Sequence, residues 1–262
     1  STHPDLEMIS FTGSTRAGID IQKHAADNIK RVSLELGGKS PNLVFADCDL
    51  EERVVASVAE CMLNTGQSCD APTRLLVERN CYEEVLQIAK QAAADTAVGN
   101  PEDEGNHIGP LFDRIQFDRV QAMIKVGIDE GATLLAGGLG KAEGYETGWF
   151  VKPTIFSDVS NHMRIAREEI FGPVLVIIPF EDEAEAIAVA AEAVEEVEPT
   201  ERKDRPPRRG RLALGDVKHM SGVGTSAPSA SPSPPPSAMR PEELLELLLF
   251  SLSTHWISPE QD

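Results

Sequence analysis

The sequence is poor in aromatic residues and cysteine, and it contains no long apolar run. Aromatic side chains make up 5% of the 262 residues, and the four cysteines include no Cys-x-x-Cys pair. This scarcity argues against a disulfide framework and suits a reducing cytoplasm, and we expect no metal site. No stretch approaches the roughly eighteen apolar residues that a membrane-spanning helix needs, and the start resembles no signal sequence. We therefore expect a soluble chain with no membrane partner.

Positive charge is also scarce. The chain has 24 Lys and Arg residues against 43 Asp and Glu residues, a formal net charge of −19. A protein that binds nucleic acid or an anionic membrane needs clustered cations to replace counterions, so we expect neither partner. Apolar residues make up 41% of the chain, which is enough for a core over most of its length.

Helical and strand-like patterns alternate along the first 190 residues, which predicts an α/β fold with a largely parallel sheet. We expect strands at 7–11, 31–36, 41–45, 74–77, 133–136, 148–155 and 174–180. We expect helices that carry 19–26, 49–62, 83–97 and 113–130, and a helix-like segment over 181–197.

Cys69 lies in a small-residue stretch, residues 64–73, between a predicted helix and a predicted strand. A thiol on a loop can be reached by a substrate, whereas a thiol inside an element is usually a small core residue. Position alone is weak evidence, because most isolated cysteines are inert.

The Gly13-Ser14 pair follows the first predicted strand and precedes a helix. A glycine allows close approach of a phosphate, and the free N–H groups of a helix start favour an anion. The spacing from Gly13 to Gly18 is not the Gly-x-Gly-x-x-Gly dinucleotide fingerprint. A helix capped by Ser14 is the simpler interpretation.

Two carboxylates stand out beside apolar residues. Glu35 lies between Leu34 and Leu36 at a predicted strand end, where we expect burial to disfavour its charged form, as a general base needs. Glu169 follows Glu168 and precedes Ile170, and a carboxylate can accept hydrogen bonds from both hydroxyls of a ribose. The alternative for Glu35 is a strand-edge acid that faces solvent, and the alternative for the Glu168-Glu169 pair is a solvated acidic turn.

Four strings in this order resemble motifs of the aldehyde dehydrogenase superfamily: Phe11 to Ser14, Glu35 to Lys39, Gly66 to Cys69, and Glu169 to Pro173. The resemblance implies a catalytic domain of that family, with Cys69 as nucleophile and Glu35 as general base. It also implies that five residues bind the cofactor: Gly13, Ser14, Gly18, Glu169 and Phe171.

The resemblance implies oxidation of an aldehyde to a carboxylic acid with NAD or NADP, through a thiohemiacetal and a thioester on Cys69. It also implies a homo-oligomer. The family's second oxyanion donor, the residues that hold the adenosine ribose and its C-terminal assembly strand are absent from this sequence, which we interpret as a piece of a longer protein.

We expect residues 1–36 to be a remnant of the cofactor-binding domain, with the Gly37-Gly38 pair at the joint, and residues 37–190 to be the catalytic domain. The resemblance ends near Ala188. Residues 191–262 contain a basic cluster and a Ser/Pro/Ala-rich stretch, so we expect a mostly disordered tail with one short helix at 241–250, produced by a frameshifted, mispredicted or fused reading frame.

Two other functions stay open. The chain could be a truncated fragment that folds without turnover. It could also be a thiol hydrolase that uses Cys69 with His107 or His162 as base, because such partners can lie far apart in the sequence.

Overall fold

A computed structural model describes residues 1–192, all within a first compact unit that spans Ser1–Glu198. The predicted short helix at 241–250 and the predicted disorder of the tail lie outside the described residues.

The chain begins with a strand, a helix and a second strand, β1 Met8–Thr12, α1 Thr15–Ala26 and β2 Arg31–Glu35. The two strands pair in parallel, with Met8 opposite Arg31 and Thr12 opposite Glu35. Gly18 is buried in α1, where a Cβ would meet the side chain of Leu36 at 2.7 Å. The absence of a side chain at Gly18 thus allows the helix to pack closely against the end of β2.

A second sheet has five strands in the order β3-β4-β7-β6-β5. All neighbouring pairs are parallel except β5 and β6, which confirms the predicted, largely parallel α/β sheet. The strands are β3 Pro41–Val44, β4 Arg74–Glu78, β5 Thr133–Ala136, β6 Thr154–Ser157 and β7 Val174–Phe180.

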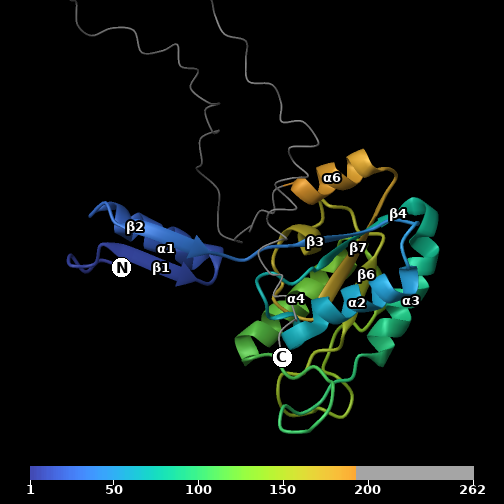
Figure 1. Cartoon of the computed structure of the whole chain (residues 1–262). Helices are drawn as coiled ribbons and strands as arrows, with labels where there is room; N and C mark the ends of the chain where they lie inside the picture. Colours follow the sequence, from blue (N-terminus) through green and yellow to red (C-terminus); the bar gives the residue numbers. More distant parts are fainter. Residues whose placement is uncertain (193–262) are drawn as a thin grey trace, which may run out of the picture. The chain divides into compact units, whose positions relative to one another are not determined.

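Helices cover both faces of this sheet (Figure 1). On one face, Leu75 of β4 and Leu175 of β7 pack with α2 and α3. On the other face, Leu76 and Val176 pack with α4, α5 and α6. The alternation explains why the central strands are apolar throughout, since both of their faces are buried. The helices are α2 Leu50–Met62, α3 Tyr82–Asp95, α4 Arg114–Asp129, α5 Arg164–Arg167 and α6 Glu183–Ala191, with short 3-10 helices η1 Leu63–Gly66 and η2 Arg79–Cys81.

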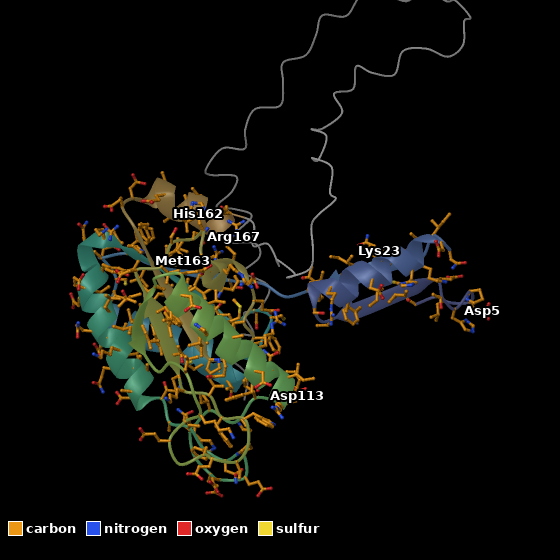
Figure 2. The ribbon with its side chains drawn as sticks, turned by 180° about the vertical axis from the view of Figure 1, so that it is seen from behind. Asp5, Lys23, Asp113, His162, Met163 and Arg167 are labelled. Atoms are coloured by element: carbon orange, nitrogen blue, oxygen red, sulfur yellow. The ribbon has the colours of Figure 1, made fainter. Side chains whose placement is uncertain are left out.

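Aspartate side chains fix the start of three of these helices. Asp49, Asp113 and Asp182 accept hydrogen bonds from backbone N–H groups three residues later, at 3.0, 2.7 and 2.9 Å. Such caps satisfy N–H groups that have no partner inside the helix. Figure 2 shows Asp113 at the start of α4. The predicted helices at 49–62, 83–97 and 113–130 are confirmed within a few residues.

Two elements differ from the prediction. The predicted strand at 148–155 pairs with neighbouring strands only from Thr154 onward. Before it, Val151 makes an isolated β-bridge with Lys141. The one-turn helix α5 was not predicted, because four residues are too few for a periodic pattern. Among the described residues, no helix is long and apolar enough to cross a membrane, and no group of three or more His, Cys, Asp or Glu residues could hold a metal ion.

Candidate active site

Cys69 lies on a tight turn that leaves its side chain exposed. The backbone N–H of Ala71 donates to the carbonyl oxygen of Ser68 at 3.3 Å, so Cys69 and Asp70 occupy the two central positions. The Ser68 hydroxyl donates to a carboxylate oxygen of Asp70 at 2.6 Å. The predicted loop position of this thiol is therefore confirmed.

The segment before the turn has an unusual backbone. Asn64, Thr65 and Gly66 are all left-handed, with φ values of 51°, 59° and 67°. The Thr65 hydroxyl donates to the carbonyl oxygen of Gly109 at 3.1 Å, and the Gln67 amide oxygen accepts from the Phe112 N–H at 3.0 Å. These contacts from residues forty or more positions away hold the conformation that presents Cys69.

The other three cysteines are less accessible. Cys61 and Cys81 are buried and Cys48 is half-buried. Burial raises the pKa of the Cys61 thiol to about 12 and also raises the pKa of Cys81. Cys69 is therefore the most accessible of the four thiols, and the thiolate is the form that reacts.

Glu35 ends β2, and its side chain is exposed. The expected burial between Leu34 and Leu36 is wrong. In a strand the flanking residues point to the opposite face from Glu35, so their apolar character does not desolvate its carboxylate. The chain that follows nevertheless approaches the thiol turn, because a Cβ on Gly38 would lie 3.4 Å from the carbonyl oxygen of Cys69.

The Gly13-Ser14 segment forms a helix cap, as the simpler interpretation predicts. Ser14 is the N-cap of α1 and accepts from the Ala17 N–H at 3.4 Å. The N–H of Gly13 donates to the carbonyl oxygen of Glu35 at 3.0 Å, so this N–H is used within the protein. The first turn of α1 contains no acidic residue, which leaves its positive end open to an anion.

Glu169 and Phe171 lie on the loop between α5 and β7. Phe171 has a left-handed backbone with φ of 56°. The Gln116 side-chain amide of α4 donates to the carbonyl oxygens of Ile170 and Phe171 at 2.9 and 2.7 Å, and Arg119 donates to the carbonyl oxygen of Glu169 at 2.9 Å. Helix α4 therefore determines the path of this loop.

The neighbouring Glu168 is not part of a solvated acidic turn. It is 8% exposed, and its two carboxylate oxygens accept from the guanidinium of Arg164 at 2.6 and 3.1 Å. The alternative interpretation is thus wrong for Glu168. His162 and Arg167, which flank this region, are labelled in Figure 2, and Arg167 pairs with Glu192 at 2.8 Å.

Two buried cations lie beside these loops and were missed by sequence reasoning. Arg74 donates to the carbonyl oxygen of Lys39 at 2.7 Å, to Asn161 at 3.0 Å, and to the carbonyl oxygens of Val189 and Ala190 at 3.1 and 3.2 Å. It thereby joins the loop after β2 to the end of α6.

Lys39 is the second buried cation. It is 2% exposed, and its ammonium group has no hydrogen-bond partner among the described residues. Burial lowers the pKa of Lys39 to about 7, and the charge of Arg74 acts in the same direction, whereas the charge of Glu169 opposes the shift.

The sequence did carry a signal for Gln116. It lies four positions before Val120 and eight before Ile124, on the buried face of α4. A polar residue at a core position of a helix needs internal hydrogen-bond partners, here the backbone of the Glu169 loop. Arg74 gives no such signal, because its partners come from segments far apart in the sequence.

The four motifs form one series of contacts. Gly13 bonds to Glu35, and Gly18 packs on Leu36. Beyond β2, Gly37 leaves the space that the Glu169 carboxylate occupies, and Gly38 faces the Cys69 backbone. Finally, a Cβ on Gly66 would collide with the carbonyl group of Gly172, so the Cys69 and Glu169 loops touch.

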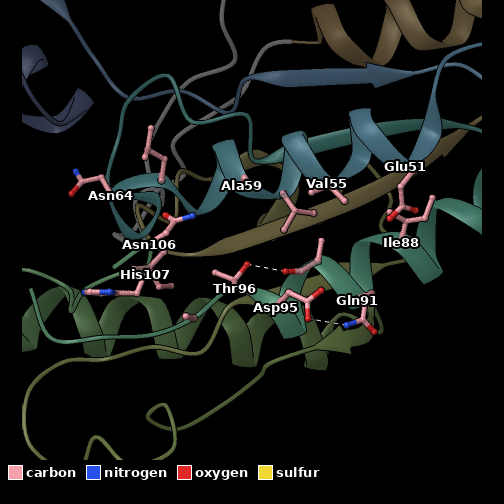
Figure 3. A pocket seen from close by; sticks show the side chains of 15 residues that line it. Glu51, Val55, Ala59, Asn64, Ile88, Gln91, Asp95, Thr96, Asn106 and His107 are labelled. Atoms are coloured by element: carbon pink, nitrogen blue, oxygen red, sulfur yellow. Dashed lines mark hydrogen bonds between the residues drawn. The ribbon is translucent and has the colours of Figure 1, made fainter. Parts of the chain in front are cut away.

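A separate cavity of about 300 Å³ lies between α2 and α3 (Figure 3). Val55, Ala59 and Ile88 supply apolar walls, and Asp95 and His107 also line it. Its lining includes none of the residues predicted for the dehydrogenase site. His107 contacts the carbonyl oxygen of Asn100 at 2.9 Å there.

The sequence matches the model of the aldehyde dehydrogenase family over residues 1–194. The chain belongs to this family. The match extends six residues beyond Ala188, where the resemblance was expected to end.

Known proteins agree with the assignment. The chain is 50% identical over 190 residues to 3-succinoylsemialdehyde-pyridine dehydrogenase of a Pseudomonas species, a match that covers 72% of this chain and 40% of the relative. Aldehyde dehydrogenase from Bartonella henselae superposes with a TM-score of 0.71 and 55% identity, over 72% of this chain and 40% of that one.

A mutant of aldehyde dehydrogenase C from Pseudomonas syringae, crystallised with NAD+ and octanal, is also similar. Its TM-score is 0.71 with 50% identity, over 72% of this chain and 39% of that one. The chain thus spans about 40% of the length of the relatives that it matches.

Proposed function

We propose that this chain carries the thiol site of an aldehyde dehydrogenase that oxidises a small aldehyde to a carboxylic acid with NAD or NADP. The observation that carries the proposal is the convergence of the motif loops. The chain leaving Glu35 contacts the Cys69 turn through Gly38, and the same segment contacts Glu169 through Gly37.

Cys69 is the proposed nucleophile, because it is the exposed thiol on a turn held by distant contacts. Attack of its sulfur on the aldehyde carbon forms a tetrahedral thiohemiacetal, and loss of hydride converts this into a thioester. The Cys69 backbone N–H is the proposed donor to the oxyanion, an interaction that contributes about 3 kcal/mol when well aligned.

Glu35 is the proposed general base that activates water to hydrolyse the thioester. Its exposed carboxylate is accessible to water, and it lies three residues before the glycine that faces the Cys69 backbone. A base in this role must reach the water within hydrogen-bond distance, either directly or through one further water molecule.

The residues present fit a dinucleotide. The start of α1, capped by Ser14 and free of acids in its first turn, suits a pyrophosphate, and Gly18 allows this helix to lie close to Leu36. Gly13 has no side chain and would let the pyrophosphate come close to the backbone. Its N–H would not bind the pyrophosphate, because it already donates to the carbonyl oxygen of Glu35. Glu169 would accept from ribose hydroxyls, and Phe171 would pack beside it. The bound cofactor supplies the hydride acceptor.

We propose that residues 1–36 belong to the cofactor-binding part and 37–190 to the catalytic part, with 191–262 outside both. We also propose assembly into a homo-oligomer, as the family resemblance implies, and a reducing location such as the cytoplasm, because all four cysteines are free thiols.

The test is to incubate the protein with a short aldehyde and either NAD or NADP and to follow the absorbance of the reduced cofactor. We expect turnover that Cys69→Ala abolishes and that Cys48→Ala, at a half-buried thiol, leaves unchanged. Formation of reduced cofactor at equal rates in the Cys69→Ala variant would overturn the assignment.

A fragment that folds without turnover is the second candidate, favoured by the span of about 40% of the relatives' length. Binding of the cofactor, measured by calorimetry, separates the two. Binding without turnover identifies the fragment as inactive. A thiol hydrolase that uses His107 as base gains no support, because His107 contacts the backbone of Asn100 and lines the separate cavity, and His162 stays the other candidate base.

A further inference from the structure

The residue after the proposed nucleophile is an acid. Asp70 shares the central positions of the turn with Cys69, and both side chains are exposed. Adjacent positions in a turn hold their side chains within several ångströms of each other. A molecule that approaches the Cys69 sulfur therefore also approaches the Asp70 carboxylate.

The carboxylate is held in place on this turn. The Ser68 hydroxyl donates to it at 2.6 Å, so the residues on either side of Cys69 are joined across the thiol-bearing position. Ser68 is half-buried and belongs to the segment that the distant contacts of Thr65 and Gln67 fix. A hydrogen bond between neighbours in a rigid turn restricts where the charge lies.

We propose that Asp70 determines substrate specificity by charge, so that the Cys69 site selects neutral or cationic aldehydes over aldehydes that carry a carboxylate near the reacting carbon. This inference rests on the proposed function for its substrate class. Its physical content, repulsion of anions from the Cys69 sulfur by Asp70, does not depend on turnover.

The repulsion is measured with two alkylating reagents that differ in charge, neutral iodoacetamide and anionic iodoacetate. Both react with the same thiolate, so the ratio of their rates cancels the intrinsic reactivity of the sulfur. Alkylation at Cys69 is separated from that at Cys48 by mass spectrometry of peptides. The ratio of the two rates therefore depends on the electrostatic potential at the sulfur, and this potential already includes the effect of every contact that Asp70 makes.

In the Asp70→Asn variant we expect the ratio of the iodoacetate rate to the iodoacetamide rate to rise about threefold, the effect of a unit charge several ångströms away in a water-like medium. Asparagine keeps an oxygen that can accept from Ser68, so the turn is retained. The matched control is Glu60→Gln, which removes one exposed charge from α2 and should leave the ratio unchanged.

The dependence of the rate ratio on salt is a second measurement. The Asp70→Asn substitution would not change this dependence if Asp70 had only a structural role. Raising the ionic strength should raise the ratio in the unmodified chain and raise it less in Asp70→Asn, where the thiolate and the other acidic residues still repel the anion but the Asp70 charge is gone. An unchanged ratio in Asp70→Asn, or the same salt response in both proteins, would overturn the proposal. Anion repulsion at Cys69 without cofactor reduction would instead count against the proposed function alone.

Discussion

A side chain at position 37 and the carboxylate of Glu169 would occupy the same space. A Cβ built on Gly37 collides with both carboxylate oxygens of Glu169, whereas one on the next residue, Gly38, meets only the carbonyl oxygen of Cys69 at 3.4 Å. The glycine pair thus has two distinct roles. Gly37 admits the proposed ribose-binding carboxylate, and Gly38 faces the thiol turn.

Gly37→Ala should therefore displace Glu169. We expect the free energy of unfolding to fall by about 1 kcal/mol, the lower end of the cost of overpacking, because only the end of a flexible side chain must move, and cofactor affinity to fall with it. Gly38→Ala is the control and should change both quantities little. Chemical denaturation checks the first effect and calorimetry the second.

A double variant tests the cause of this loss. Removing the carboxylate in Gly37→Ala/Glu169→Ala should restore most of the lost stability, measured against Glu169→Ala alone. Additive losses from the two substitutions would show that the glycine is needed for another reason.

Gly66→Ala should destabilise the turn before Cys69. Its φ of 67° is unfavourable for alanine, and the added methyl group would also collide with the backbone of Gly172. We expect a loss of about 3 kcal/mol, the sum of left-handed strain and backbone displacement. Denaturant unfolding measures it.

Gly131→Ala separates the two contributions. Gly131 has φ of 89°, and nothing lies within 4 Å of the position of its Cβ. Only the strain of about 1–2 kcal/mol should appear there. Equal losses at both positions would exclude a packed contact between Gly66 and Gly172.

Lys39→Met should stabilise the protein most at neutral pH and below. Burial lowers the pKa of Lys39 from 10.5 to about 7 in the folded protein. The unfolded chain therefore binds more protons between these values, and the stability of the unmodified protein rises with pH across that window.

The advantage of Lys39→Met should shrink over the same window, from at most about 5 kcal/mol below pH 7, because one pKa unit corresponds to about 1.4 kcal/mol. Urea unfolding of both proteins at pH 6, 8 and 10 checks the trend. A difference that is independent of pH would contradict a buried, titrating Lys39.

Arg74→Met should loosen the contact between α6 and the sheet. The substitution leaves the carbonyl oxygens of Lys39 and Ala190 without the donor that Arg74 supplies, whereas the carbonyl oxygen of Val189 keeps a hydrogen bond from Asn161 at 3.5 Å. We expect a loss of about 3 kcal/mol or more, since each buried acceptor left unsatisfied costs about 1–3 kcal/mol.

Hydrogen exchange provides the specific readout for Arg74→Met. Amide protection should fall in α6 and less in α3, whose residues pack on the other face of the sheet. A uniform loss over both helices would mean that Arg74 supports the whole fold rather than this junction.

Elements with a strong local cause could be predicted from the sequence. The helix that starts at Asp49 has a capping acid, and the strand from Val174 to Phe180 has a continuous apolar run, so both were found near their observed bounds. The loop position of Cys69 was also predicted from its neighbours in the sequence, which are small residues between a predicted helix and a predicted strand.

Features that depend on contacts over long sequence distances could not be predicted. Glu35 was expected to be buried because of its neighbours in the sequence, yet its own face of β2 is exposed. The hydrogen bonds of Arg74 join segments more than thirty residues apart, and the left-handed backbone of Thr65 has no marker in its residue type. The roles of Cys69 and Glu35 stay predictions until they are measured.

The loop that carries Cys69 has two parts that differ in how well they should tolerate mutagenesis. The first part is the three successive left-handed residues at 64–66. Thr65 contacts Gly109 and Gly66 packs on Gly172, so a mutagenesis library that varies these two residues would mostly sample destabilised chains. Ser68 and Asp70 are held by side-chain bonds to each other and are half-buried and exposed, respectively. Diversity placed at these two positions would alter the surroundings of the sulfur while the scaffold beneath it stays intact.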